Sequence, residues 1–450
     1  MTSLNGLTYQ VRTFGCQMNK HDSERIDGML EALGALASDD VEKAEVVIFM
    51  TCCVREAADV RLLGQVASLK GSGKLIAVGG CIGQRDGARL LEKAPHVDVV
   101  FGTHNIAHLP ALLAAALEGH GAQVEVLDGS EKSAAPSAMA LPSRREHSWH
   151  AWLPIMTGCD NYCSYCVVPF VRGRERSRPL EEIRDEVRRL VDEGVQEITL
   201  LGQNVNSYGR DLYGSPRFAE VLREVGASGI ARLRFVTSHP KDLSDDTIAA
   251  FAETPAIMPQ LHLPVQSGSD AILAAMNRHY TAAHYLELVE KLRVACKAAG
   301  KDVALSTDLI VGFPGEREED FEATLALVRA VGFAQAFTFI YSRREGTPAA
   351  ALEDTSPREL IQGRFDSLVE LVQKSAWEQN QKELGAVLPV LFEGSSKRDA
   401  RVLVGRSPKN QTVHAPLSEG QSVENFVGCL GTVRIEEART WYLRGLLVQT

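Results

Sequence analysis

Three cysteines stand close together in the chain at Cys159, Cys163 and Cys166, spaced four and then three residues apart. Cysteine thiolates are the usual ligands of iron–sulfur clusters, and a cubane cluster normally takes four of them. The motif supplies three, so a fourth iron would stay open for a small molecule, which a closed zinc site does not allow. The alternatives are a zinc site with a distant fourth ligand and three unrelated cysteines.

Three further cysteines share one position relative to predicted strands. Cys16, Cys52 and Cys81 follow short β-rich runs at residues 9–14, 46–50 and 75–78. Ligands in open α/β sheets bind outside the carboxyl ends of the strands. Cysteines that are far apart in the sequence are therefore expected to meet at one cluster, and the alternative is that they are buried apolar residues.

The other cysteines are predicted to be packing residues. Cys53 could compete with Cys52 as a ligand, but successive residues of an extended segment point to opposite sides. Cys53 is therefore expected to face away from the site. Cys296 lies in a helical pattern and Cys429 in a β-rich region, where a small apolar side chain suits a core.

The elements that must position these cysteines divide into three units. Residues 1–127 are predicted to form a parallel α/β domain, with a further strand at 97–100 and Ser23 as the cap of the first helix. Residues 128–147, rich in Ser, Ala and Pro, are predicted to be a linker. A chain of 450 residues is too long for one core, which agrees with several domains.

The second unit, residues 148–382, contains six predicted strands separated by helical patterns such as 180–193 and 318–331. Six βα units fall short of the eight that close a barrel, so an open partial barrel is expected. The strands are predicted at 152–156, 197–201, 232–235, 260–263, 304–310 and 336–340.

The third unit, residues 383–450, follows a polar helix near 358–382. Its short β-runs and close turns predict a small all-β barrel. The runs are 387–392, 400–404, 431–435 and 441–448.

Composition limits the function classes. Nine cysteines without a secretory signal indicate metal ligation rather than disulfides. No apolar stretch approaches the roughly 20 residues that span a bilayer, so a cytoplasmic protein with no membrane partner is expected. The net charge of −10 argues against a nucleic-acid partner unless basic residues gather locally.

The spacing at Cys159 resembles the signature of the radical S-adenosylmethionine (SAM) superfamily. This resemblance implies that the open iron of a [4Fe-4S] cluster chelates SAM and cleaves it to a deoxyadenosyl radical. The motifs at 13–19, 51–52 and 80–81 resemble the amino-terminal domain of the methylthiotransferase family, in which a second [4Fe-4S] cluster carries the sulfur to be inserted. The family usually has Asn where this chain has Met50, and Ser or Ala at the position of Cys53.

The resemblance is closest to the tRNA-modifying branch of that family. It covers the runs 158–163, 172–178, 201–208 and 262–269, and Gln17-Met18-Asn19 favours the tRNA branch over the branch that modifies a ribosomal protein. It implies methylthiolation of N6-dimethylallyladenosine at position 37 in the anticodon stem-loop of tRNA. One SAM would donate the methyl group, and a second would be the radical source.

The resemblance also implies a flavodoxin-type or ferredoxin-type electron donor and a sulfur donor. Nothing in the sequence demands more than a monomer, which is therefore expected. The alternatives are a methylthiotransferase that acts on threonylcarbamoyl-adenosine tRNA or a ribosomal protein, and a non-catalytic iron–sulfur RNA-binding protein. A non-catalytic protein would not cleave SAM under reduction.

Further candidates come from strand ends and local charge. Gln203, Ser238, Gln266 and Asp308 fall at or near ends of barrel strands, where they are predicted to bind the cofactor or, alternatively, to cap loops. The carboxyl-terminal unit resembles a TRAM domain, a small RNA-binding barrel. The predicted RNA-binding residues are Arg172, Arg174 and Arg176 beside the second cysteine set and Lys397, Arg398 and Arg401 in the terminal barrel.

Overall fold

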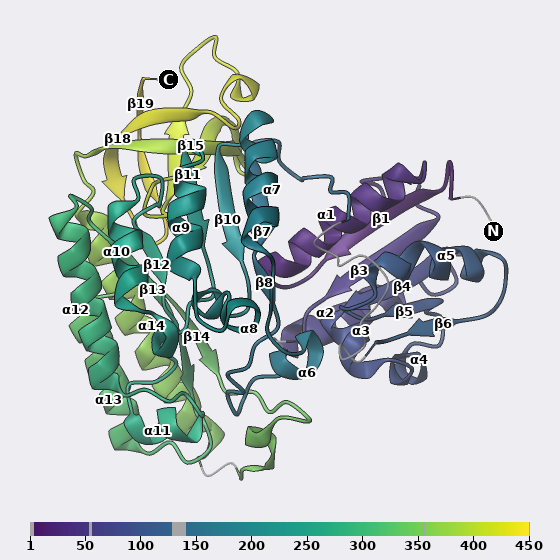
Figure 1. The fold of residues 1–450 in the computed structure, drawn as a ribbon, viewed down its shortest axis with the longest axis horizontal. Coiled ribbons are helices and arrows are strands. Elements are labelled where there is room, and N and C mark those ends of the chain that lie inside the picture. The colour runs from purple at the N-terminus through teal and green to yellow at the C-terminus, as the bar shows by residue number, and fades with distance from the viewer. Residues whose placement is uncertain (1–3, 54–55, 128–140, 354–355, 450) are drawn as a thin grey trace.

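The computed structural model describes residues 4–53, 56–127, 141–353 and 356–449. The amino-terminal sheet lies to one side of the central sheets and their helices, and the carboxyl-terminal strands gather at one end of that central part (Figure 1). The α/β class with a terminal β-barrel, predicted from the sequence, is confirmed.

The amino-terminal sheet has six parallel strands in the order β2-β1-β3-β4-β5-β6. Strand β3 is buried along its whole length, because helices cover both faces of the sheet. Its side chains alternate between two cores: Val46, Ile48 and Met50 pack in one, and Val47 and Phe49 in the other. The strands are β1 Thr8–Thr13, β2 Leu36–Ala37, β3 Val46–Thr51, β4 Leu75–Gly80, β5 Val99–Phe101 and β6 Gln123–Glu125.

The helices of this part are α1 Gln17–Ala32, α2 Glu56–Ser68, α3 Cys81–Asp86, α4 Arg89–Lys93 and α5 Leu109–Leu117. The predicted cap at Ser23 is wrong, because α1 begins at Gln17 with Cys16 as its N-cap residue. Ser23 is buried inside the helix, and its hydroxyl lies 2.7 Å from that of Thr13. The sequence pattern did not reveal the start of α1, because the first turns of this helix are polar and their polar side chains are buried by partners from other parts of the fold.

The central part contains the six predicted strands as two three-stranded parallel sheets, β7-β10-β11 and β12-β13-β14. A single bridge from Leu233 to Ile257 leads from β11 toward β12, and one apolar core runs beneath both sheets. The partial barrel is therefore confirmed. Its strands are β7 His150–Pro154, β10 Glu197–Leu201, β11 Arg232–Phe235, β12 Gln260–His262, β13 Ala304–Val311 and β14 Gln335–Ile340.

Helices pack around these strands and alternate with them along the chain (Figure 1). A small antiparallel pair, β8 Met156–Thr157 and β9 Arg176–Ser177, closes the base of the loop that carries the second cysteine set. The helices are α6 Val168–Arg172, α7 Leu180–Asp192, α8 Arg210–Tyr213, α9 Phe218–Gly226, α10 Asp245–Glu253, α11 Asp270–Ala275, α12 Ala282–Ala298, α13 Glu318–Val331 and α14 Arg358–Gln381.

The terminal strands close into a barrel in the order β15-β16-β17-β19-β18. The sequence pattern missed β17, a short strand that lies between β16 and β19 in the barrel. The barrel docks on β11, where Arg232 donates to the carbonyl oxygen of Pro389 at 2.8 Å and Arg234 to that of Ser407 at 2.9 Å. The strands are β15 Val387–Ser396, β16 Asp399–Arg406, β17 Thr412–Pro416, β18 Leu430–Ala438 and β19 Leu443–Gln449.

Part of the predicted linker packs against α1, and its residues 128–140 lie outside the described residues. Leu141 is buried, and the amide of Arg144 donates to the carbonyl oxygen of Glu24 at 2.9 Å. Among the helices that the structure describes, none is long and apolar enough to cross a membrane.

This packing predicts opposite effects for two helical Gly→Ala substitutions. Alanine normally stabilises a helix interior by about 1 kcal/mol relative to glycine. At Gly28 in α1, however, the new methyl group would lie 2.6 Å from the carbonyl oxygen of Pro142, so we expect Gly28→Ala to cost about 1–3 kcal/mol. Gly363→Ala in α14 meets nothing within 4 Å and should stabilise. Thermal unfolding of both variants measures the sign of each change in the free energy of unfolding. Changes of the same sign in both variants would contradict this packing.

Candidate active site

Cys16, Cys52 and Cys81 lie just past the carboxyl ends of β1, β3 and β4, which are neighbours in the parallel sheet. Neighbouring strands are about 4.8 Å apart, so the three loops leave the sheet side by side. Gly15 is pressed against Cys52: a methyl group there would lie 2.9 Å from its sulfur. The structure thus brings the predicted first set together at one edge.

Two buried side chains tie these loops to one another. The amide of Asn19 donates to the carbonyl oxygens of Phe14 and Thr51, at 2.7 and 2.8 Å. The hydroxyl of Thr51 donates to Gly79 at 2.6 Å and accepts from the amide of Ile82 at 3.1 Å. The segments before Cys52 and around Cys81 are therefore held in register.

The expectation that Cys53 faces away from the site is wrong. Cys53 is fully buried and its thiol hydrogen-bonds Cys81, because the chain bends after β3 and the alternation of an extended strand ends there. Hydrogen bonds from Cys53 and then Arg172 lower the pKa of Cys81, although burial opposes them. Cys81 thus has the thiolate character that metal ligation requires. Cys296 is buried as predicted, but Cys429 is exposed.

The second cysteine set lies on the loop between β8 and α6. The amide of Cys159 donates to the carbonyl oxygen of Gly173 at 3.1 Å, and that of Cys166 to Cys163 at 2.9 Å. Burial raises the pKa of Cys159 to about 11 and that of Cys166 to about 12. Both thiols are therefore protonated at neutral pH, and metal binding must displace the protons.

Residues after α11 hold this loop from the other side. The amide of Asn277 donates to the carbonyl oxygen of Tyr162 at 2.9 Å. Arg278 is buried and donates to the sulfur of Cys163 at 3.4 Å and to the carbonyl oxygen of Pro264 at 2.7 Å. A guanidinium that contacts a thiol sulfur stabilises negative charge there. Sequence reasoning did not find Arg278, which lies far from the motif in the chain.

The donor chemistry of both sets fits iron–sulfur clusters. Among the described residues, no three His, Cys, Asp or Glu side chains converge on a point suited to a single metal ion. A cubane does not need such a point, since each of its thiolates binds a different iron.

Three of the four predicted cofactor residues, Gln203, Ser238 and Gln266, lie just past the carboxyl ends of barrel strands, and Asp308 lies within a strand. Gln203 accepts from the amide of Gly158 at 2.5 Å and so supports the loop that carries Cys159, Cys163 and Cys166, here called the cluster loop. The backbone of Gln266, with a φ of 71°, donates to the carbonyl oxygen of Asp308 at 2.9 Å. Asp308 itself lies within β13, 3.6 Å from the imidazole of His262.

Ser238 belongs to a group of buried polar atoms that have no hydrogen-bond partner within the described part of the chain. Buried polar atoms are almost always paired, so such a group indicates a place for a polar ligand. The group lies on the cluster loop and on the loops after β10 and β11, and a further contact links two of its members, because the amide of His239 donates to Asn206 at 2.9 Å. The atoms are Asn161 Nδ2, Asn204 Oδ1, Asn206 Nδ2, Ser238 Oγ and His239 Nε2.

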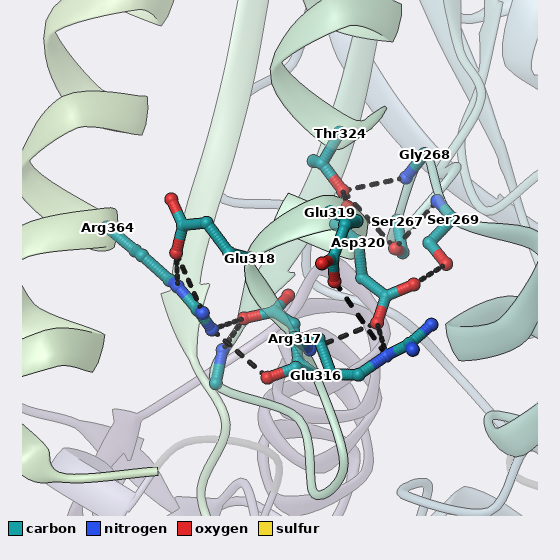
Figure 2. A network of polar contacts seen from close by, with 11 residues as sticks. Ser267, Gly268, Ser269, Glu316, Arg317, Glu318, Glu319, Asp320, Thr324 and Arg364 are labelled. Atoms are coloured by element: carbon teal, nitrogen blue, oxygen red, sulfur yellow. Dashed lines mark hydrogen bonds and ion pairs between the residues drawn. The ribbon is translucent and has the colours of Figure 1, made fainter. Parts of the chain in front are cut away.

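The turn after β13 is clamped by charges, as Figure 2 shows. Glu316 accepts from the amide of Gly312 at 2.9 Å and from Arg364 at 3.3 Å. Asp320, at the start of α13, accepts from the hydroxyl of Ser269 at 2.6 Å. The turn and the loop after β12 therefore hold each other in place.

The predicted RNA-binding residues do not behave alike. Arg172 is only 6% exposed and pairs with Asp22, so its assignment to an RNA-binding surface is wrong. Arg174 and Arg176 are exposed, as are Lys397, Arg398 and Arg401 in the terminal barrel. Burial of one arginine among exposed neighbours depends on its contacts with Asn19 and Asp22 of α1, which the charge pattern does not show.

Comparisons with known proteins agree with this arrangement. Residues 153–328 match the Radical SAM superfamily, and residues 8–102 match a family described as Uncharacterized protein family UPF0004. The tRNA-2-methylthio-N(6)-dimethylallyladenosine synthase of Streptomyces avermitilis is 50% identical over 418 residues, which cover 90% of this chain and 81% of the relative. That of Carboxydothermus hydrogenoformans is 46% identical, covering 98% and 99%.

The chain belongs to this synthase family. A solved structure of the radical S-adenosylmethionine methyltransferase TsrM from Kitasatospora setae superposes with a TM-score of 0.55 at 16% identity, covering 77% of this chain and 74% of that one. This likeness shows a shared fold. Both cysteine sets lie within the two matched regions.

The unpaired hydroxyl of Ser238 generates a prediction. Ser238→Ala should leave the unfolding free energy within about 1 kcal/mol of the parent value, because it removes a buried group that makes no hydrogen bond, but it should weaken SAM binding by about tenfold. The control Ser267→Ala removes a buried hydroxyl that accepts from the amide of Ser269, and should destabilise without a comparable loss of SAM affinity. Thermal unfolding and anaerobic equilibrium dialysis measure both quantities. Unchanged SAM affinity in Ser238→Ala would contradict the assignment.

Proposed function

We propose that the chain converts N6-dimethylallyladenosine at position 37 of tRNA to its 2-methylthio derivative, using SAM and two [4Fe-4S] clusters. The observation that carries the proposal is the placement of two cysteine trios on two parts of the chain that α6 connects. Cys16, Cys52 and Cys81 lie at the carboxyl ends of three neighbouring parallel strands, and Cys159, Cys163 and Cys166 lie on the single loop between β8 and α6. One cluster alone would be enough for SAM cleavage. The other cysteine trio can hold a further cluster that carries the sulfur to be inserted.

In this proposal Cys159, Cys163 and Cys166 hold the cluster that chelates SAM, and Cys16, Cys52 and Cys81 hold the cluster that carries sulfur. The bound SAM and its cluster supply a radical that can remove hydrogen from an aromatic carbon, which no side-chain base can do. The protein orients the reactants, a role supported by the unpaired polar atoms near Ser238.

An RNA substrate is supported by exposed aromatic and basic side chains beside the cluster loop. Tyr162 and Phe170 are 41% and 55% exposed, with ring centroids 6.4 Å apart. Unstacked RNA bases are commonly held on such aromatic rings. Arg174 and Arg176 add positive charge at the same place, and the terminal barrel adds Lys397, Arg398 and Arg401.

The reaction also needs components that the chain does not contain. An electron donor of the flavodoxin or ferredoxin type would reduce the SAM-binding cluster, and a sulfur donor would restore the other. We place the enzyme in the cytoplasm as a monomer, with domains at residues 1–127, 148–382 and 383–450.

The two-cluster assignment predicts separable losses. Replacing Cys159, Cys163 and Cys166 by Ala should leave about four irons per chain and no SAM cleavage, whereas replacing Cys16, Cys52 and Cys81 should preserve SAM cleavage and abolish methylthiolation. Iron analysis after anaerobic reconstitution and mass spectrometry of tRNA nucleosides from a complemented deletion strain measure both. Full methylthiolation after replacement of Cys16, Cys52 and Cys81 would overturn the mechanism. A methylthio group on threonylcarbamoyl-adenosine instead would change the substrate.

The exposed basic residues of the terminal barrel predict salt-sensitive tRNA binding. Replacing Lys397, Arg398 and Arg401 by Gln should weaken binding and reduce the slope of log K against log salt by about 2, since each lost phosphate contact contributes roughly 0.7–0.9. The control replaces exposed Arg188, Arg223 and Lys291 on the outer helices. Affinities measured at two salt concentrations test this; equal slopes for both triple variants would remove the terminal barrel from the RNA-binding surface.

A further inference from the structure

Arg172, the last residue of α6, reaches from the central part of the chain into the first cysteine site. Its guanidinium lies 2.9 Å from the amide oxygen of Asn19 and 2.8 Å from a carboxylate oxygen of Asp22, both on α1. Asn19 is the residue whose amide ties the loops of Cys16 and Cys52 together. Arg172 therefore contacts the brace of that site.

Arg172 also acts on the cysteines themselves. It hydrogen-bonds Cys81, and its charge acts on Cys16. Three thiolates would bring negative charge to this place, where Cys52 and Cys81 are buried and Cys16 is exposed, and an uncompensated buried charge is costly. Asp22 neutralises part of the charge of Arg172, so the balance at the site depends on both residues.

Both ends of α6 also adjoin the second cysteine site. The helix starts two residues after Cys166, and Gly173, which follows Arg172, accepts from the amide of Cys159 at 3.1 Å. Between these ends, the carbonyl oxygen of Val171 accepts from the hydroxyl of Thr103 at 2.6 Å, which fixes α6 to the amino-terminal part. One five-residue helix thus touches both cysteine sites.

A chain of buried polar contacts extends this connection across α1. His21 lies 3.4 Å from Asp22 and accepts from Arg25 at 3.1 Å, and Arg25 in turn pairs with Glu186 of α7 at 2.8 Å. Such a network resists displacement, because breaking one pair leaves a buried charge without a partner. Arg172 is therefore held at a defined position.

We propose that Arg172 is a positioning residue for the sulfur-carrying cluster: it holds the loops of Cys16, Cys52 and Cys81 against the SAM-binding loop, and its charge stabilises the reduced cluster. This inference rests on the proposed function, which places a cluster on these cysteines. Hydrogen bonds and charge near the cluster sulfurs are general determinants of its reduction potential.

The test uses the full chain with Cys159, Cys163 and Cys166 replaced by Ala, so that only the first cluster remains. In this background Arg172→Gln should shift the reduction equilibrium about tenfold toward the oxidised cluster, which is about 59 mV for one electron. Arg172→Lys keeps the charge and should recover part of the shift. Asp22→Asn removes a negative charge and should shift the potential in the opposite direction. Arg174→Gln, an exposed arginine two residues away, should leave the potential unchanged.

Anaerobic redox titration followed by electron paramagnetic resonance, with iron analysis of each sample, gives the outcomes. Opposite shifts in Arg172→Gln and Asp22→Asn support the inference, because a purely structural role would not reverse sign. An unchanged potential in Arg172→Gln at full iron content, or shifts in the same direction, would overturn it. Should Arg172→Gln fail to load iron, Asp22→Asn decides: an upward shift supports the inference and no shift overturns it. Absence of iron from the background protein itself would instead contradict the proposed first cluster.

Discussion

The contact of Arg172 with Asn19 and Asp22 joins the two halves of the site, and the relative placement of the two cysteine sets depends on it together with the Arg25–Glu186 pair. Each cysteine trio is placed by its own sheet, but the sheets are separate and no strand ladder runs between them. A buried ion pair tolerates little displacement, because the loss of either partner leaves a charge in a low-dielectric interior. The position of one cysteine site relative to the other is therefore set by α6, which packs against α3 and places Arg172 against α1, and by the contacts of α1 with β7 and α7.

Parallel strands impose the second constraint. All strands of a parallel sheet end at the same edge, so residues distant in the chain meet in the loops beyond that edge. This places Cys16, Cys52 and Cys81 together in one part and gathers Gln203 and Ser238 near the cluster loop in the other. The open side of the two three-stranded sheets fits a large substrate better than a closed barrel, whose interior is filled by side chains.

Backbone strain gathers around the same region. Of the six non-glycine residues with positive φ in the described part of the chain, Tyr162 lies on the cluster loop, Thr237 and Gln266 lie on the loops after β11 and β12, and Asn277 and His279 lie between α11 and α12. Such conformations persist only where the surroundings impose them. The hydrogen bond from Asn277 to Tyr162 shows one such restraint. The unpaired buried atoms of Asn206 and Ser238 lie on the loops after β10 and β11, and such atoms indicate a place for a polar ligand.

The corrected predictions share one cause. Ser23 was expected to cap a helix, yet it lies inside α1, whose polar residues Asn19 and Asp22 are buried by partners from distant segments. Arg172 was expected at the surface with Arg174, and Cys53 was expected to point away from the cluster site. In each case local pattern rules were applied to a residue whose surroundings come from another part of the chain.

The amino-acid sequence by itself determined the six strands of the partial barrel, the two cysteine trios and the family, because strand periodicity, cysteine spacing and motifs are local properties of the chain. It missed short strands such as β2, β6 and β17. It placed β10, β11 and α13 at their observed bounds. Only the tertiary structure decided that Arg278 contacts Cys163 and that Arg172 is buried beside Cys81. Those contacts join residues about 90 to 115 positions apart, and their formation depends on how whole elements pack, which no local pattern specifies.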